Sequence, residues 1–270
     1  MKKDKYHKPL LTSDEPWASL RSLTEARIGL GRCGSSQRTQ AQLAFQLAHA
    51  RARDAVHIPL DFAALQQQFA LQAMPFVRLH SQAIDRSEYL KRPDKGRRLD
   101  RASIDLLKEQ AGNGLVYDAS IVLVDGLSSS AVQQHGAVMV ELICEQLKSM
   151  GLRCSPLCLV EQGRVAIGDE VAELLGSRLL ILLIGERPGL SSPDSLGIYY
   201  TYQARVGLTD ESRNCISNIR PAGLIPEEAA KRLMWLITES ERLMLSGVRL
   251  KDKSNKDSAE LARKGNFLLE

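Results

Sequence analysis

The sequence predicts an α/β fold with a Rossmann-like or flavodoxin-like, mostly parallel sheet that has helices on both faces, preceded by a smaller, mainly helical N-terminal domain. From residue 113 onward, continuous apolar runs of four to six residues alternate with helical patterns. This alternation is typical of parallel strands that are buried on both faces. The charge also changes there, because residues 1–110 carry 19 Lys and Arg against 12 Asp and Glu, whereas residues 111–270 carry 17 against 20. We therefore expect two domains, residues 1–112 and 113–270.

The first half shows three helical patterns and one short strand. The clearest helix covers residues 39–57, where Leu43, Leu47 and Ala50 recur at spacings of four and three and the pattern stops before Pro59. Residues 14–30 begin with acidic residues and a proline, which are helix start signals. The same spacing predicts a helix over 62–71, and residues 76–80 are expected to form a strand.

The second half supplies the predicted sheet. We expect helices over 128–150, 169–175 and 226–246, a charged tail after Gly247, and strands over 121–124, 156–160, 179–184, 199–206 and 215–219. In such a sheet, ligands bind beyond the carboxyl ends of the strands. The candidate ligand-binding segments are therefore 125–128, 161–165, 185–189 and 215–218.

Composition narrows the class of protein. With 44% hydrophobic and 25% charged residues, the 270-residue chain is typical of globular proteins. Its longest apolar run, 179–184, is far short of the roughly 20 residues that cross a bilayer. The five cysteines are odd in number and scattered, and residues 1–11 are basic and polar, without a secretory signal. We expect a cytoplasmic protein that does not bind membranes.

Several motifs have simpler explanations than a ligand site. Residues 29–34 match G-x-G-x-x-G by letter, but they follow a predicted helix rather than a strand, so a loop is the better interpretation. Cys154 and Cys158 lack the partners of a zinc site and are expected to be buried thiols. Ser128 is best explained as a helix cap, with phosphate binding as the alternative.

The basic segment 88–101 carries six basic and three acidic residues, but Tyr89 is its only aromatic residue. Nucleic-acid binding favours interleaved aromatic residues, so we expect a solvated face and no nucleic-acid partner. The histidines are not spaced as metal ligands, and we expect neither a metal site nor a catalytic residue in this chain. Three hypotheses remain open: a subunit completed by a partner, a stand-alone ligand-binding or regulatory module, and a phosphate-handling enzyme using residues 125–130.

Six strings in a fixed order point to one family. Together they resemble the small (light) subunit of ethanolamine ammonia-lyase over about residues 14–247, which is far more specific than any one string. The strings are 26–34 (ARIGLGRCG), 45–56 (FQLAHARARDAV), 92–99 (RPDKGRRL), 124–128 (VDGLS), 185–189 (GERPG) and 215–219 (CISNI).

The resemblance implies an adenosylcobalamin-dependent lyase that converts ethanolamine to acetaldehyde and ammonia by a radical mechanism. In that family the large subunit carries the substrate site and faces the adenosyl group, while the small subunit covers the corrinoid from the other side, with the cofactor's own base on the cobalt. The partner implied is therefore the large subunit, in a hetero-oligomer. Some family members reside in a bacterial microcompartment through an amphipathic N-terminal extension, and residues 1–11 show no clear apolar stripe, so this location stays open.

The resemblance also implies three cofactor-binding residues, which are Val165, Glu186 and Cys215. All three fall in the segments that the predicted sheet places at its ligand edge. A corrin ring is rimmed by primary amides, so a carboxylate such as Glu186 can accept their N–H groups, and Val165 supplies apolar contact. The simpler explanations are a salt bridge for Glu186 and a buried small apolar residue for Cys215.

Overall fold

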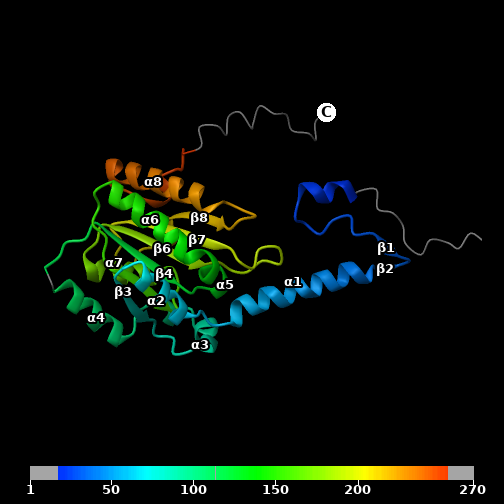
Figure 1. The fold of residues 1–270 in the computed structure, drawn as a ribbon, viewed down its shortest axis with the longest axis horizontal. Helices are drawn as coiled ribbons and strands as arrows, with labels where there is room; N and C mark the ends of the chain where they lie inside the picture. Colours follow the sequence, from blue (N-terminus) through cyan, green and yellow to red (C-terminus); the bar gives the residue numbers. More distant parts are fainter. Residues whose placement is uncertain (1–17, 113, 255–270) are drawn as a thin grey trace, which may run out of the picture.

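A six-stranded mixed sheet lies at the centre of the molecule in a computed structural model that describes residues 18–112 and 114–254 (Figure 1). The strands follow the spatial order β3-β5-β4-β6-β7-β8. Their bounds are β3 Phe76–His80, β4 Ala119–Val124, β5 Leu157–Glu161, β6 Leu179–Gly185, β7 Leu196–Tyr202 and β8 Asn214–Ile219.

The first four strands of this order are parallel, β7 runs antiparallel to them, and β8 runs antiparallel to β7 and so in the same direction as the first four. Val122 of β4 lies opposite Cys158 of β5 and Leu182 of β6. β7 is antiparallel to both neighbours because the connections from β6 to β7 and from β7 to β8 contain no α-helix that would return the chain to the other end of the sheet. The prediction of an α/β fold with a mostly parallel sheet is confirmed, while the Rossmann-like or flavodoxin-like arrangement stays a prediction.

Helices cover the two faces of the sheet unequally. One apolar core lies between the sheet and three helices, which are α2 (Phe62–Leu71), α6 (Ala137–Ser149) and α8 (Pro226–Leu243). The strands β5, β4, β6, β7 and β8 all contribute side chains to this core. α4 (Arg101–Ala111) and α7 (Ile167–Leu175) form the second core, on the alternate residues of β3, β5, β4 and β6. Strand alternation explains the division, because neighbouring residues of a strand face opposite sides of the sheet.

The N-terminal half contributes to the same sheet. β3 pairs with β5 over its whole length, and α4 packs against α7. The division into domains at residue 112 stays a prediction. The expected tail beyond residue 254 and the beginning of the first predicted helix lie outside the described residues.

α1 (Thr39–His57) extends away from the sheet as an arm (Figure 1). Its predicted bounds are confirmed, but only Ala55 is buried, while Leu43, Phe45 and Leu47 are exposed. Its carboxyl end is held by Arg86, whose Nε donates to the Val56 carbonyl at 2.7 Å.

Before α1, the structure differs from the sequence prediction. The helix expected over residues 14–30 is, in its described part, only the 3-10 helix η1 (Ala18–Leu23). Gly29 and Gly31 adopt positive φ angles of 55° and 69°, which a right-handed helix excludes. A two-strand hairpin, β1 (Arg32–Cys33) and β2 (Ser36–Gln37), follows, so the prediction of a loop rather than a dinucleotide fingerprint agrees with this geometry.

Three other predicted elements need correction. The segment 88–101 is not simply a solvated face, because it includes most of α3 (Arg86–Lys91) and the 3-10 turn η2 (Lys95–Arg97), and Tyr89 and Leu99 are fully buried. The helix expected over 128–150 consists of α5 (Ser129–Ala131), a π-helical turn (Val132–Gly136) and α6. The strand expected over 199–206 lies earlier in the chain, as β7.

Candidate functional site

Val165 lies in the turn that joins β5 to α7. Gln162 adopts a positive φ of 55° there, and the N–H groups of Gln162 and Gly163 donate to the Asp125 carboxylate at 3.0 and 3.2 Å. These bonds fix the turn against the carboxyl end of β4. Val165 is half-buried just before the amino end of α7.

Glu186 directly follows β6 and is half-buried. Its Oε2 accepts hydrogen bonds from the Ser195 hydroxyl and, at 3.2 Å, from the N–H of Asn218. Its Oε1 accepts no hydrogen bond from the described part of the chain, and no described cation forms an ion pair with it, so the salt-bridge explanation is not supported there. A Cβ added at Gly197 would lie 2.8 Å from Oε1, which places this oxygen directly over β7.

Cys215 and Tyr199 are paired across β8 and β7, so their side chains share one face of the sheet. The Tyr199 hydroxyl and the Cys215 thiol interact across the two strands. Desolvation raises the pKa of Cys215, the interaction with Tyr199 opposes that rise, and the negative charge of Glu186 adds to it. Cys215 itself is exposed rather than a buried apolar residue, so that simpler explanation is wrong. Cys215 therefore lies beside Tyr199, and Glu186 lies over Gly197, two residues earlier on β7.

Val165 and Tyr199 lie on the wall of the same cavity, which has a volume of about 540 Å³. Arg164, Val206 and Arg213 also line it. Sequence reasoning did not include Tyr199 among the candidate residues. The signal was the strand alternation around it, since Ile198 and Tyr200 are buried in the core beneath α8, whereas Tyr199 faces the opposite side.

The part of the sheet beside this cavity lacks a described helix over it. α7 packs against β4 and β6, whereas Cys215 and Ser217 on β8 are exposed on the same side of the sheet as Tyr199. Of the three predicted residues, only Val165 lines this cavity; Cys215 lies on the adjoining sheet face beside Tyr199, which does line it, and Glu186 lies over Gly197 of the same strand. This arrangement suits a flat ligand that a second surface covers.

A buried ion pair fixes one wall of the cavity. The Arg213 guanidinium donates to both carboxylate oxygens of Asp169 at 2.6 and 2.8 Å, and both side chains are 2% exposed. Arg213 immediately precedes β8 and Asp169 belongs to the first turn of α7. The pair therefore links the strand that carries Cys215 to the helix that follows Val165.

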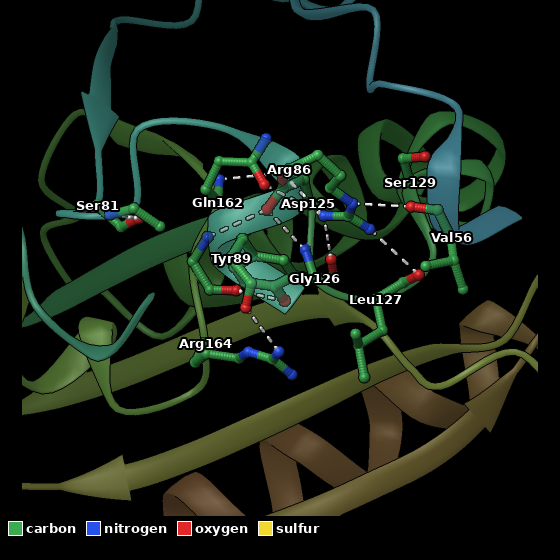
Figure 2. A network of polar contacts seen from close by, with 12 residues as sticks. Val56, Ser81, Arg86, Tyr89, Asp125, Gly126, Leu127, Ser129, Gln162 and Arg164 are labelled. Atoms are coloured by element: carbon green, nitrogen blue, oxygen red, sulfur yellow. Dashed lines mark hydrogen bonds and ion pairs between the residues drawn. The ribbon is translucent and has the colours of Figure 1, made fainter. Parts of the chain in front are cut away.

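A second buried network lies around Arg86, Tyr89 and Asp125 (Figure 2). Arg86 lies 3.6 Å from the buried Asp125 carboxylate and donates to the carbonyls of Val56 and Gly126 at 2.7 and 2.8 Å. The Tyr89 ring contacts the guanidinium groups of Arg86 and Arg164, whose central carbons lie 4.7 and 4.1 Å from its centroid. This network connects α3 to the loops that follow α1, β4 and β5.

Other motifs have structural roles in the described chain. The Ser128 hydroxyl accepts a hydrogen bond from the N–H of Ala131 at 3.2 Å, which confirms the helix cap. Cys158 is buried as predicted, whereas Cys154 is only half-buried. Burial raises the pKa of Cys154 to about 11 and that of Cys158 to about 12, as expected for inert thiols. Within residues 18–112 and 114–254, no group of three His, Cys, Asp or Glu side chains gathers as metal ligands.

Comparison with known proteins gives the family. Residues 14–251 match the model of the ethanolamine ammonia-lyase light chain. The chain belongs to this family. Curated relatives named ethanolamine ammonia-lyase small subunit include those of Ralstonia nicotianae, 52% identical over 97% of each chain, and Pseudomonas putida KT2440, 54% identical over 96% of this chain and 97% of the relative. The small subunit of Pseudomonas aeruginosa PAO1 is 52% identical over 97% of both chains.

Membership of the ethanolamine ammonia-lyase light chain family confirms the resemblance found in the six sequence strings. The relatives' name marks them as subunits of a lyase, and the word "small" implies a larger partner. In the described part of the chain, no helix is long and apolar enough to cross a membrane. The roles of Val165, Glu186 and Cys215 in binding a cofactor remain predictions.

Proposed function

We propose that this chain is the small subunit of an adenosylcobalamin-dependent ethanolamine ammonia-lyase, which converts ethanolamine to acetaldehyde and ammonia only together with the large subunit. In this proposal the chain covers the corrinoid on the side opposite the adenosyl group. The observation that carries the proposal is the position of Glu186, whose Oε1 accepts no hydrogen bond from the described residues and lies over β7, the strand whose Tyr199 lines the cavity. We place the protein in the cytoplasm, either free or inside a bacterial microcompartment.

The residues at this face fit the chemistry of a corrinoid. A corrin is a broad, flat ring with primary amides on its rim, and Glu186 offers one unpartnered carboxylate oxygen to accept an amide N–H. Cys215 is exposed on the same face of the sheet as Tyr199. The Tyr199 ring and the Val165 side chain, both half-buried, supply apolar surface.

When bound, adenosylcobalamin supplies the radical chemistry of the reaction. In this proposal the described residues of this chain bind the cofactor and orient it. Glu186 is held by Ser195 and Asn218, so its free oxygen is fixed before the ligand arrives, which lowers the entropic cost of binding. The sheet beneath Tyr199 excludes water from one side of the ligand, and the large subunit encloses the other side.

Replacing Glu186 by Gln tests this proposal. Because Ser195 and Asn218 both donate to the Oε2 position, the amide oxygen of Gln occupies it and the NH₂ group replaces the free Oε1. This NH₂ group faces the amide donors of the corrin with a donor of its own. We expect E186Q to raise the Kd for cobalamin in the two-subunit complex about tenfold, measured by visible-absorption titration, since a charge-assisted hydrogen bond contributes about 1.5–3 kcal/mol.

The matched control is Glu141→Gln on the exposed side of α6, which should leave cobalamin binding unchanged. Size-exclusion chromatography should show normal subunit assembly for both variants. Cobalamin affinity equal to that of the wild type in E186Q would assign Glu186 a structural role only. Failure of the wild-type chain to form a complex with any large subunit would favour the stand-alone ligand-binding module.

The exposed arm α1 supports the proposal of a large partner. Leu43 and Leu47 lie one helical turn apart and are 58% and 52% exposed. We expect the double substitution Leu43→Ser and Leu47→Ser to reduce co-purification of the large subunit at least tenfold, because these side chains would bury apolar surface only in the complex. Leu71→Ser, at an 82% exposed position on α2, is the control. Equal co-purification of the double variant and the wild type would exclude the arm from the interface.

A further inference from the structure

The cavity beside Val165 has a positively charged rim. Four arginines line it, and two of them are neutralised within the chain: Arg98 by Glu170, at 2.8 Å, and Arg213 by Asp169. Asp210, the other acidic residue of the lining, is 3.4 Å from Arg213. The remaining two, Arg97 and Arg164, form no ion pair with any described residue.

Arg164 is fixed on this rim before any ligand binds. Its guanidinium carbon lies 4.1 Å from the centroid of the Tyr89 ring, and its Nη2 donates to the Tyr89 carbonyl at 3.1 Å (Figure 2). The Tyr89 hydroxyl in turn donates to the carbonyl of Gly163, the residue before Arg164, at 3.1 Å. The Nε of Arg164 is buried and has no hydrogen-bond partner among the described residues. Arg164 is therefore positioned by its neighbours without being neutralised by them.

Gly96 brings Arg97 to the same rim. The Arg164 N–H donates to the Gly96 carbonyl at 2.7 Å, and a Cβ added at Gly96 would lie only 2.9 Å from Cγ of Arg164. The η2 turn that ends in Arg97 thus rests directly on Arg164. The amino end of α7, with its partial positive charge, follows within three residues of Arg164 and adds to the positive potential of this part of the cavity.

We propose that Arg164 and Arg97 form an anion subsite that holds the phosphodiester of the nucleotide loop of cobalamin. This inference rests on the proposed function. Guanidinium groups match phosphate oxygens in geometry and charge, and the phosphodiester is the ionised group of the nucleotide loop. With the corrin on the open face near Tyr199, the nucleotide side of the ring faces this chain, and the loop enters the adjoining cavity. The subsite gives a charged partner to Arg97 and Arg164, which form no ion pair within the described part of the chain.

Comparing two corrinoids tests the subsite. The complex of the full chain with its large subunit is titrated with cyanocobalamin and with dicyanocobinamide, which lacks the phosphate, ribose and base, and binding is measured by equilibrium dialysis. We expect Arg164→Gln and Arg97→Gln each to raise the Kd for cyanocobalamin about tenfold, equivalent to about 1.4 kcal/mol. The Kd for dicyanocobinamide should change less than about twofold in the same variants, because the group that the arginines bind is missing.

Arg101→Gln is the matched control, since Arg101 lies in the same basic segment but forms an exposed pair with Asp105 away from the cavity lining. Thermal unfolding checks each variant, and Arg97 is exposed, so its substitution leaves the fold intact. Unchanged cyanocobalamin affinity in both variants, or equal weakening of both corrinoids, overturns the subsite while the proposed function stands. A wild-type complex that binds neither corrinoid overturns the proposed function, and the subsite with it.

Discussion

Gly185→Ala should lower the free energy of unfolding by about 4 kcal/mol or more, which is an exceptional loss for one methyl group. A Cβ at Gly185 would lie 1.9 Å from the Ser128 carbonyl oxygen and 2.9 Å from that of Asp125. Both contacts are with backbone atoms, so no side-chain rotation relieves them. Gly126, which adopts a φ of 62°, packs equally closely from the other side, since its own added Cβ would meet the Gly185 carbonyl at 2.3 Å.

Urea unfolding followed by circular dichroism measures this loss. Gly112→Ala is the control, because Gly112 already has a helical φ of −63° and an added Cβ would meet neighbouring atoms only at 3.4 Å. We expect the control to unfold within about 0.5 kcal/mol of the wild type. A Gly185→Ala chain as stable as the control would mean that the loops after β4 and β6 can separate. The inference that Glu186 is held in a fixed position would then be wrong.

Arg86→Leu should destabilise the chain by about 3–5 kcal/mol at pH 8, because it leaves a buried carboxylate without its cationic partner. The Arg86 guanidinium lies 3.6 Å from Asp125, and the two side chains are only 17% and 4% exposed. Burial raises the pKa of Asp125 to about 6, and Arg86 together with three backbone N–H donors limits that rise. Without Arg86, the pKa of Asp125 in the folded chain rises further.

The sign of the pH dependence follows from that shift. A carboxyl group whose pKa is higher in the folded than in the unfolded state stabilises the fold at low pH, and this stabilisation is lost as the pH rises through the folded-state pKa. In Arg86→Leu the loss continues to a higher pH than in the wild type. The difference in stability between the two chains should therefore be smaller at pH 5 than at pH 8, by at least about 1 kcal/mol.

Arg101→Leu, which breaks an exposed pair with Asp105, serves as the control and should cost less than about 1 kcal/mol at either pH. Chemical denaturation at both pH values gives the comparison. A constant cost of Arg86→Leu across this range would show that Asp125 does not titrate there. A cost as small as that of the control would remove Arg86 from the structural network.

Periodicity predicted the regular elements well because the buried residues of a helix or a strand recur at a regular spacing. The bounds of α1, α2 and β3 agree with the prediction, and the buried runs around β4, β5 and β6 are off by one or two residues. Elements with mixed composition were missed. The residues of α3 and η2 are mostly charged, and the burial of Tyr89 involves a contact with Arg164, which is 75 residues away in the sequence. No local pattern encodes such a contact.

The candidate site divides in the same way. The alternation of strands and helices placed Val165 and Glu186 after strands, and the family resemblance selected them together with Cys215. The pairing of Tyr199 with Cys215 required the register of β7 against β8, and the Arg213–Asp169 pair required the loop before β8 to approach α7. These contacts join segments far apart in the sequence, so only the folded chain reveals them.

Through β3, the N-terminal half of the chain supplies the edge strand that pairs with β5. β3 occupies the outer side of β5, whose residues from Leu157 to Val160 are buried. A polypeptide that starts at residue 113 would expose a row of unpaired backbone donors and acceptors on an apolar strand, which is a template for edge-to-edge aggregation. Keeping the α/β layer soluble therefore depends on a strand that is synthesised well before the rest of the sheet.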